Sequence, residues 1–260
     1  MRAVLLLLSA FSLPVFAVGQ ELPSTYPPSG ERGTYYLSIQ ATDSTSYPAV
    51  YPNPTVRDSI DAQHKSHYDA ARAIEKHVLS EQNISFLHPA EGGETLWEQK
   101  NRVWNLVMTD GDTTRLDPKA VTHRFARFFL EHYYQEHELV LFRLLYGKQV
   151  DFAVVSRESG QIFDVFGPPR FSPSDRWFAS FHDDGLAGWS PNGLQIFRIE
   201  SGSIQKAIEY DMGRKEPGPT GLRWINKTTF QLEMRDHHIV RGGTTTNYKH
   251  YRANIRTTED

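Results

Sequence analysis

The chain has 260 residues, a formal net charge of −3 and no cysteine, and its 23% charged and 12% aromatic residues are typical of a globular protein. Without cysteine there is no disulfide, thiolate nucleophile or thiolate metal site, and the nearly balanced charge gives no electrostatic reason to expect a nucleic-acid partner. The length suits one domain, with or without an appended segment.

Residues 1–19 have the pattern of a signal peptide. Arg2 supplies the positive start, and an apolar run follows it as far as Phe16. The small residues Ala17 and Gly19 then fit two alternative cleavage positions. A short membrane anchor is the alternative interpretation, but the run is too short to span comfortably a hydrocarbon core of about 30 Å. We therefore expect a periplasmic or secreted protein without a membrane span.

Residues 20–53 are rich in proline, serine and tyrosine, which argues against a helix or a central strand over most of this segment. We expect an extended arm that contacts a partner or covers the edge of a sheet. Within the arm, a short strand is predicted over 34–41, where the residues have high β-propensity.

A single amphipathic helix is predicted over 54–82. Asn53 and Pro54 are residue types favoured at a helix start. After them, one stripe of residues recurs at steps of three or four positions, which is the spacing of one helix face. The residues of this stripe are Val56, Ile60, His64, Tyr68, Ala71, Ile74 and Val78.

From 95 to 256, segments of strand length alternate with turn signals, which predicts a β repeat domain. The apolar residues of the aromatic-rich segment 122–147 fit both the spacing of a helix and the alternation of a strand. We favour two strands, because the second half of the segment leads directly into the strand-like DFAVV. One turn sequence is repeated: Glu158-Ser-Gly-Gln-Ile162 recurs as Glu200-Ser-Gly-Ser-Ile204. A period of about 40–45 residues with four short strands is typical of a propeller blade.

The segment Phe171-Ser-Pro-Ser-Asp-Arg-Trp-Phe-Ala179 resembles the F-S-P-D-G-R-x-[L/I]-A turn of WD-repeat-like and TolB-type β-propeller blades, and Trp189-Ser-Pro-Asn-Gly193 is similar to the same turn. The resemblance covers about 150–235 and is shared with small exported bacterial proteins of unassigned function. It implies that this turn joins the innermost strand of a blade to the next strand. Asp175 is followed by arginine instead of glycine, which departs from the pattern.

The predicted fold class is therefore mainly β, with a partial or small β-propeller-like array of twisted antiparallel sheets preceded by one long amphipathic helix. Propeller folds serve many activities, so this fold class does not identify a reaction. The sequence also lacks the motifs of common hydrolases, zinc proteases, P-loop proteins and dinucleotide-binding proteins.

Two histidine pairs are candidate metal ligands. His64 and His67 lie three positions apart on the predicted helix, but a zinc site needs three or four ligands. We therefore favour a buried position for His64 and a bordering position for His67. His237 and His238 would point to opposite faces of a strand, so they would not chelate one ion together.

Two further constellations combine histidine with carboxylates. The segment 132–138 fits an acid–base pair or a polar connection between strands, and we favour the connection. In the loop that follows RWFASF, His182, Asp183, Asp184 and Trp189 could bind a cation through oxygen ligands or present an aromatic anchor with a polar rim to a partner. We predict partner binding by these four residues.

The predicted function is an exported, non-enzymatic binding or interaction module of the cell envelope, whose partner is another envelope or extracellular protein. The alternative is an exported hydrolase with a composite site formed by blade loops, and a structural envelope subunit is a third reading. No catalytic residue, metal ligand or cofactor is assigned, and the oligomeric state is left open. A deep polar pocket would favour the hydrolase, whereas an exposed aromatic patch would favour the binding module.

Overall fold

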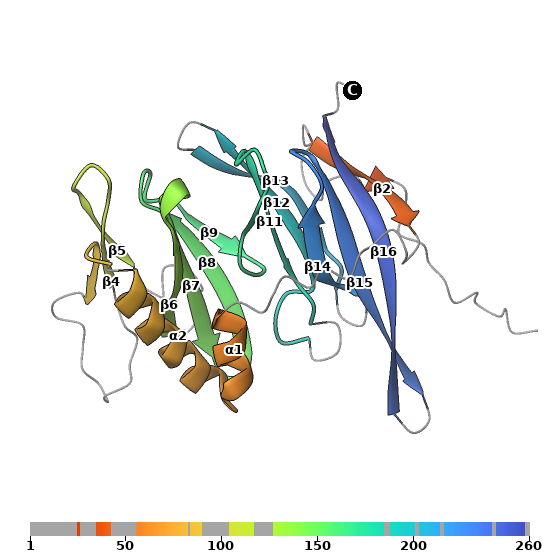
Figure 1. Ribbon diagram of the computed structural model, residues 1–260, viewed down its shortest axis with the longest axis horizontal. Helices are drawn as coiled ribbons and strands as arrows, with labels where there is room; N and C mark the ends of the chain where they lie inside the picture. Colours follow the sequence, from red (N-terminus) through yellow and green to blue (C-terminus); the bar gives the residue numbers. More distant parts are fainter. Residues whose placement is uncertain are drawn as a thin grey trace, which may run out of the picture.

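The computed structural model describes residues 25–26, 35–42, 56–82, 84–89, 104–116, 127–184, 188–200, 203–213, 216–240 and 243–257. Two α-helices precede most of the strands: α1 (Val56–Gln63) and α2 (His67–Glu81). The strands in this part of the chain form four antiparallel sheets, which confirms the mainly β fold class (Figure 1).

Three of the sheets are simple meanders of consecutive strands. The first sheet contains β3 (Leu87–Pro89), β4 (Trp104–Val107) and β5 (Thr113–Leu116). The second contains β6 (Arg127–Tyr134), β7 (Leu139–Tyr146), β8 (Gln149–Ser156) and β9 (Ile162–Val165), with a short 3₁₀ turn at Gln135–His137. The third contains β10 (Arg170–Phe171), β11 (Trp177–His182), β12 (Gly193–Glu200) and β13 (Ser203–Asp211).

The fourth sheet joins the two ends of the described chain. Its order is β1-β2-β16-β15-β14, made from β1 (Thr25–Tyr26), β2 (Tyr35–Thr42), β14 (Gly218–Trp224), β15 (Thr229–Val240) and β16 (Gly243–Thr257). Leu37 of β2 pairs with Ile255 of β16, and Leu37 is fully buried. The strand predicted in the arm therefore exists, and it covers the edge that β16 would otherwise expose.

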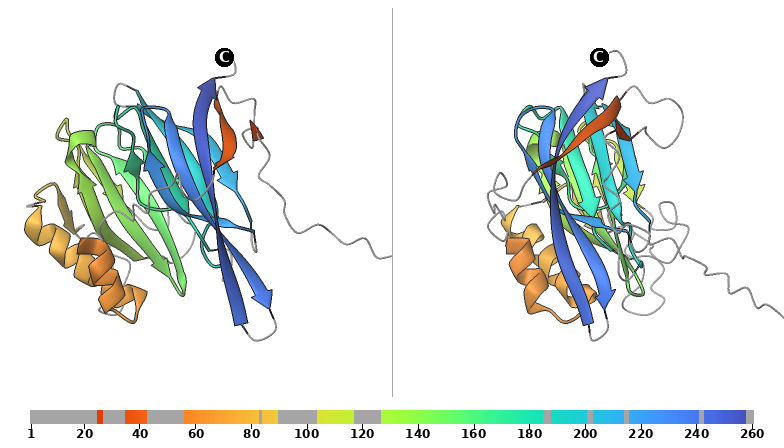
Figure 2. Two further views of the ribbon diagram at one scale, coloured as in Figure 1. Left: turned by 45° about the vertical axis from the view of Figure 1, so that its right-hand side comes forward. Right: turned by 90° about the vertical axis from the view of Figure 1, so that its right-hand side faces the viewer.

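The sheets pack face to face in chain order, as Figures 1 and 2 show. One apolar cluster lies between the first sheet, α2 and the second sheet, another between the second and third sheets, and another between the third and fourth. Burying each large side chain in these clusters stabilises the fold by about 1.5–3 kcal/mol. In the described residues no cluster joins the first sheet to the fourth, and the row of sheets does not close into a ring.

The strand β7 shows how one sequence serves two packed faces. All but the last of its residues are buried, because both faces of the second sheet are covered. Val140, Phe142 and Leu144 belong to the cluster with the first sheet, whereas Leu139 and Leu141 belong to the cluster with the third. The period of two along the strand separates these sets.

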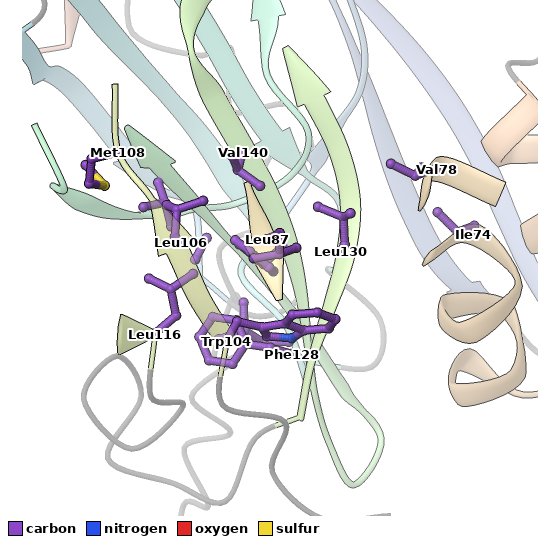
Figure 3. Close-up of a cluster of buried hydrophobic side chains, with 14 residues drawn as sticks. Ile74, Val78, Leu87, Trp104, Leu106, Met108, Leu116, Phe128, Leu130 and Val140 are labelled. Atoms are coloured by element: carbon purple, nitrogen blue, oxygen red, sulfur yellow. The ribbon is translucent and has the colours of Figure 1, made fainter. Parts of the chain in front are cut away.

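The single helix predicted over 54–82 is wrong, because α1 and α2 are separate helices. Ser66 has an extended backbone, with φ −120° and ψ 136°, and its Oγ accepts a hydrogen bond of 3.1 Å from the Asp69 backbone N–H. This is an N-cap, which starts a new helix at His67. Ile74 and Val78 of α2 point towards the sheets, whereas His64 lies in the break and is exposed (Figure 3).

The repeated turn occupies equivalent places in two successive sheets. The first copy connects β8 to β9, and the second falls between β12 and β13, so each joins the third strand of a meander to the fourth. Gly160 has φ +69°, a conformation that glycine adopts without strain. The repeat prediction is confirmed, and so is the prediction of two strands, β6 and β7, within 122–147.

The two turns that resemble propeller turns are not equivalent. The turn at 172–175 joins β10 to β11, between the first and second strands of its sheet, and Ser172 N–H bonds to Trp177 C=O at 2.8 Å. Asp175 takes φ +56°, which aspartate tolerates better than most residues. The segment 189–193 instead leads from β11 into β12, the second and third strands of the same sheet, so the two turns occupy different places in it.

Candidate functional site

Of the four residues predicted to bind a partner, His182 ends β11, and Asp183, Asp184 and Trp189 lie in the loop that follows it. Asp184 organises this loop. Its Oδ2 accepts hydrogen bonds from the backbone N–H groups of Trp189 and Ser190, at 2.6 and 2.5 Å. Its C=O accepts the Gly188 N–H at 3.0 Å. The carboxylate of Asp184 is thus used to shape the loop, as aspartates commonly are in turns.

Asp183 is not the exposed carboxylate that the sequence suggested. Its side chain is only 5% exposed, and its Oδ2 accepts a hydrogen bond of 2.5 Å from Nε of Arg235 on β15 and lies 2.5 Å from Nη2 of the same guanidinium in an ion pair. Its Oδ1 lies against Gly218 on β14, so closely that a Cβ at that position would be 2.3 Å away. Asp183 therefore ties the third sheet to the fourth, and the prediction that it faces a partner on the surface is corrected.

Trp189 and Trp177 lie as expected from their sequence contexts. Trp177, within an alternating strand, is 8% exposed, whereas Trp189 is 54% exposed on the loop. The Nζ of Lys148, in the β7–β8 turn, is 5.7 Å from the centroid of the Trp189 ring. A cation at this distance from an indole face is attracted to it.

The chain next to Trp189 is fixed to the second sheet. Ser190 Oγ donates a hydrogen bond of 2.7 Å to the C=O of Val150 and accepts one of 3.2 Å from its N–H. Together with the hydrogen bonds to Asp184, these contacts fix the backbone that carries the exposed Trp189 indole. His182, the last residue of β11, pairs with Gly193, the first residue of β12, so these two residues form the base of the loop.

Beside the loop is a hollow with a volume of about 350 Å³. Its lining brings the histidine pair of His64 and His67 together with His182, which lies more than 100 positions away in the sequence. Its other described lining residues come from the α1–α2 break, β7, β8, the β9–β10 connection and β11: Lys65, Ser66, Ala70, Arg143, Val150, Phe152, Gly167, Pro168 and Phe181.

The position of the hollow follows from how the second sheet is covered. Leu141 on β7 packs against the third sheet, whereas Leu145 on the same face packs against Ala71 of α2. Arg143 lies between them along β7. The hollow therefore lies on this face of the second sheet, between the part that packs against the third sheet and the part that packs against α2.

Arg143, which lines the hollow, belongs to a buried ion pair. The guanidinium of Arg143 binds the Glu131 carboxylate through Nε–Oε2 and Nη2–Oε1 contacts, both of 2.9 Å, and the two side chains are 2% and 0% exposed. Glu131 sits where the β6–β7 register shifts, at a β-bulge. A bulge re-aims a side chain, which explains how a carboxylate in an apolar strand meets its partner.

The remaining histidine clusters stay apart from the hollow. The rings of His132 and Tyr134 are in contact on β6, and the His137 ring stacks on Phe171 at 3.9 Å with its Nε2 3.6 Å from Asp175 Oδ1. The side chains of His237 and His238 lie outside the described residues. In the part of the chain that is described, no three His, Asp or Glu residues are arranged to hold a metal ion.

Sequence reasoning missed Lys65, Glu131, Arg143 and Lys148 as parts of this region. For two of them a signal was present, because Glu131 and Arg143 are charged residues in the interior of the largely apolar strands RFFLEHYY and LVLFRLLY. A charge at such a position is almost always paired. For Lys65 and Lys148 the sequence held no comparable signal.

No family model matches the chain, and no curated protein matches it either. Among the described residues, neither helix is long and apolar enough to cross a membrane. The residues 1–19, with the predicted signal peptide, and most of the arm at 20–53 lie outside the described residues.

Proposed function

We propose that the protein is an exported, non-enzymatic binding module of the cell envelope, and that it binds an envelope or extracellular protein through the surface around Trp189. We also propose that its sheets are blades of the WD-repeat-like or TolB type. Loops at the ends of packed sheets are common recognition sites, because the scaffold keeps them in place.

The observation that carries the proposal is the exposure of Trp189 on a fixed backbone. A half-exposed indole adjoined by Lys148 is the kind of residue that anchors protein interfaces. Because Asp184 and Ser190 already hold the backbone, binding would lose little conformational entropy in the loop. Of the four predicted residues, Trp189 is thus the contact residue, His182 borders it, and Asp183 and Asp184 support it.

The hydrolase alternative finds less support in the contacts. Ser66 is the hydroxyl residue in the described lining of the hollow, and its Oγ donates to Asp69 Oδ2 at 2.9 Å while it caps α2. A nucleophilic serine needs its proton to be taken by a neighbouring base. The Ser66 hydroxyl is engaged in capping instead.

Site-specific crosslinking tests the proposal in cells that make the full chain. A photo-reactive amino acid at position 148 should crosslink one defined partner, which mass spectrometry identifies. The control carries the same probe at Tyr248, which is also exposed but lies on β16. Adducts at both positions, or at neither, would contradict a specific surface.

The isolated partner then allows a quantitative test. Trp189→Ala should weaken binding by about 30-fold or more, the equivalent of ~2 kcal/mol for an anchor residue, whereas Tyr248→Ala should not. Because the indole is exposed, neither variant should change the melting temperature by more than a few degrees. Equal affinity of the Trp189→Ala variant and the parent protein would refute the proposal.

A further inference from the structure

We propose that the hollow is a separate binding site, for a small organic anion in which a carboxylate or phosphate is attached to an apolar body. This goes beyond the proposed protein-binding surface, because Trp189 is not among the residues that line the hollow. The argument rests on the charges of the lining, on the start of α2, and on the apolar side chains of the interior.

The charged and titratable side chains of the hollow favour an anion. Its described lining includes Lys65 and the three histidines His64, His67 and His182, and no acidic residue. Arg143 also lines it, but Glu131 balances that charge. The described lining is therefore basic and contains no carboxylate that would repel an anion.

The carboxylates next to the hollow are occupied by other groups. Asp183 is bound by Arg235, and Asp184 is bound by two backbone N–H groups of its own loop. Asp69, in the first turn of α2, accepts a hydrogen bond of 2.9 Å from the Ser66 hydroxyl. None of these three carboxylates lines the hollow, so the charged side chains that do line it are basic.

The start of α2 also favours an anion. The helix has 15 residues and begins at His67, so its first backbone N–H groups and its positive dipole end lie at the hollow, beside Lys65 and Ser66. Helix starts of this kind stabilise negative groups. Here the helix start is joined by residues of β7, β8, the β9–β10 connection and β11, so the site is a partly open hollow instead of an isolated helix end.

The interior favours an apolar body. Ala70, Val150, Phe152, Pro168 and Phe181 line the hollow, and Phe152 is 5% exposed. Arg143 lies over the Phe152 ring at 5.7 Å and is locked by its two bonds to Glu131, so this part of the lining is rigid. A volume of about 350 Å³ suits a ligand of one or two rings.

Binding is measured by calorimetry on the mature protein with benzoate and phenyl phosphate as probes. The proposal expects at least one of them to bind with a dissociation constant below about 1 mM. Whichever binds tighter identifies the preferred anionic group. Benzamide, which keeps the ring without the charge, and inorganic phosphate, which keeps the charge without the ring, should each bind at least tenfold more weakly.

A matched pair of variants locates the site. Lys65→Gln with His67→Gln should weaken binding of the better probe at least tenfold, whereas Lys76→Gln with His77→Gln, on the same helix but outside the lining, should leave it unchanged. Lys65 and His67 are exposed, so the first variant should stay folded, which circular dichroism checks. As a second route, His182→Ala should also weaken binding, because it removes a ring that lines the hollow from the end of β11.

The outcomes separate this site from the proposed function. Trp189→Ala should bind the anion normally, even if it loses the protein partner. No binding of either charged probe, equal binding of benzamide, or equal effects of the two variant pairs would overturn the anion site. Inorganic phosphate as tight as phenyl phosphate would overturn the apolar part of the proposal.

Discussion

The Glu131–Arg143 pair offers the sharpest test of how the region around the hollow is stabilised. Both side chains are almost completely withdrawn from water, and two parallel hydrogen bonds of 2.9 Å join them. Glu131→Gln keeps the shape of the side chain and removes its charge. The guanidinium of Arg143 is then buried against a neutral amide, without the opposite charge that compensates its loss of water.

The expected loss of unfolding free energy is about 3–5 kcal/mol, the range for breaking a buried pair by removing one partner. This is a large share of the roughly 5–15 kcal/mol by which domains are stable. At about 2–4 °C per kcal/mol for a domain of this size, the melting temperature should fall by roughly 6–20 °C. Removing both charges together, as in Glu131→Leu with Arg143→Met, should recover most of the loss.

Urea unfolding followed by tryptophan fluorescence gives the free energies of unfolding. The variants can be compared when the slope of this free energy against urea concentration is the same for each of them. Glu136→Gln is the matched control, because Glu136 is exposed in the turn that follows β6. A loss below about 1 kcal/mol for Glu131→Gln would match a surface pair and would refute the argument that Arg143 is sealed from water.

Two more variants test contacts between sheets. Asp183→Asn should lower the unfolding free energy by about 1–3 kcal/mol, since Arg235 loses a charged hydrogen-bond partner; a melting temperature equal to that of the parent would mean that this contact contributes nothing. Leu37→Ala should cost about 2–5 kcal/mol in urea unfolding, because Leu37 is fully buried in the core between the third and fourth sheets. A small effect there would show that β2 is dispensable.

The features that the sequence predicts well depend on neighbours along the chain. Alternation in RWFASF places Trp177 inside, and the glycines before Trp189 place it in a loop, and both positions are confirmed. The repeated Glu-Ser-Gly turns fall between the same strands of successive sheets for the same reason. The break at Ser66 was also encoded locally, since Ser66 and Asp69 form a helix start, but the continuous spacing of apolar residues concealed it.

The features that were missed depend on residues far apart in the sequence. Asp183 looked like an exposed turn former because its partner Arg235 comes from another sheet. In the same way, His64 and His182 meet at one hollow only because α2 and the third sheet cover adjacent parts of the same face of the second sheet. No spacing along the chain carries that information.

The pairing of β2 with β16 sets an order of events for a newly made chain. Leu37 is synthesised early and its partner Ile255 very late, although the two end up side by side. Joining such distant segments adds little to the entropy of closing the loop, which grows only slowly with length, but it makes folding slow. Until 243–257 exist, the apolar strand YYLSIQAT has no place in its sheet and is available to pair with other chains. The fourth sheet is thus the part of the molecule that cannot assemble until nearly the whole chain has been synthesised.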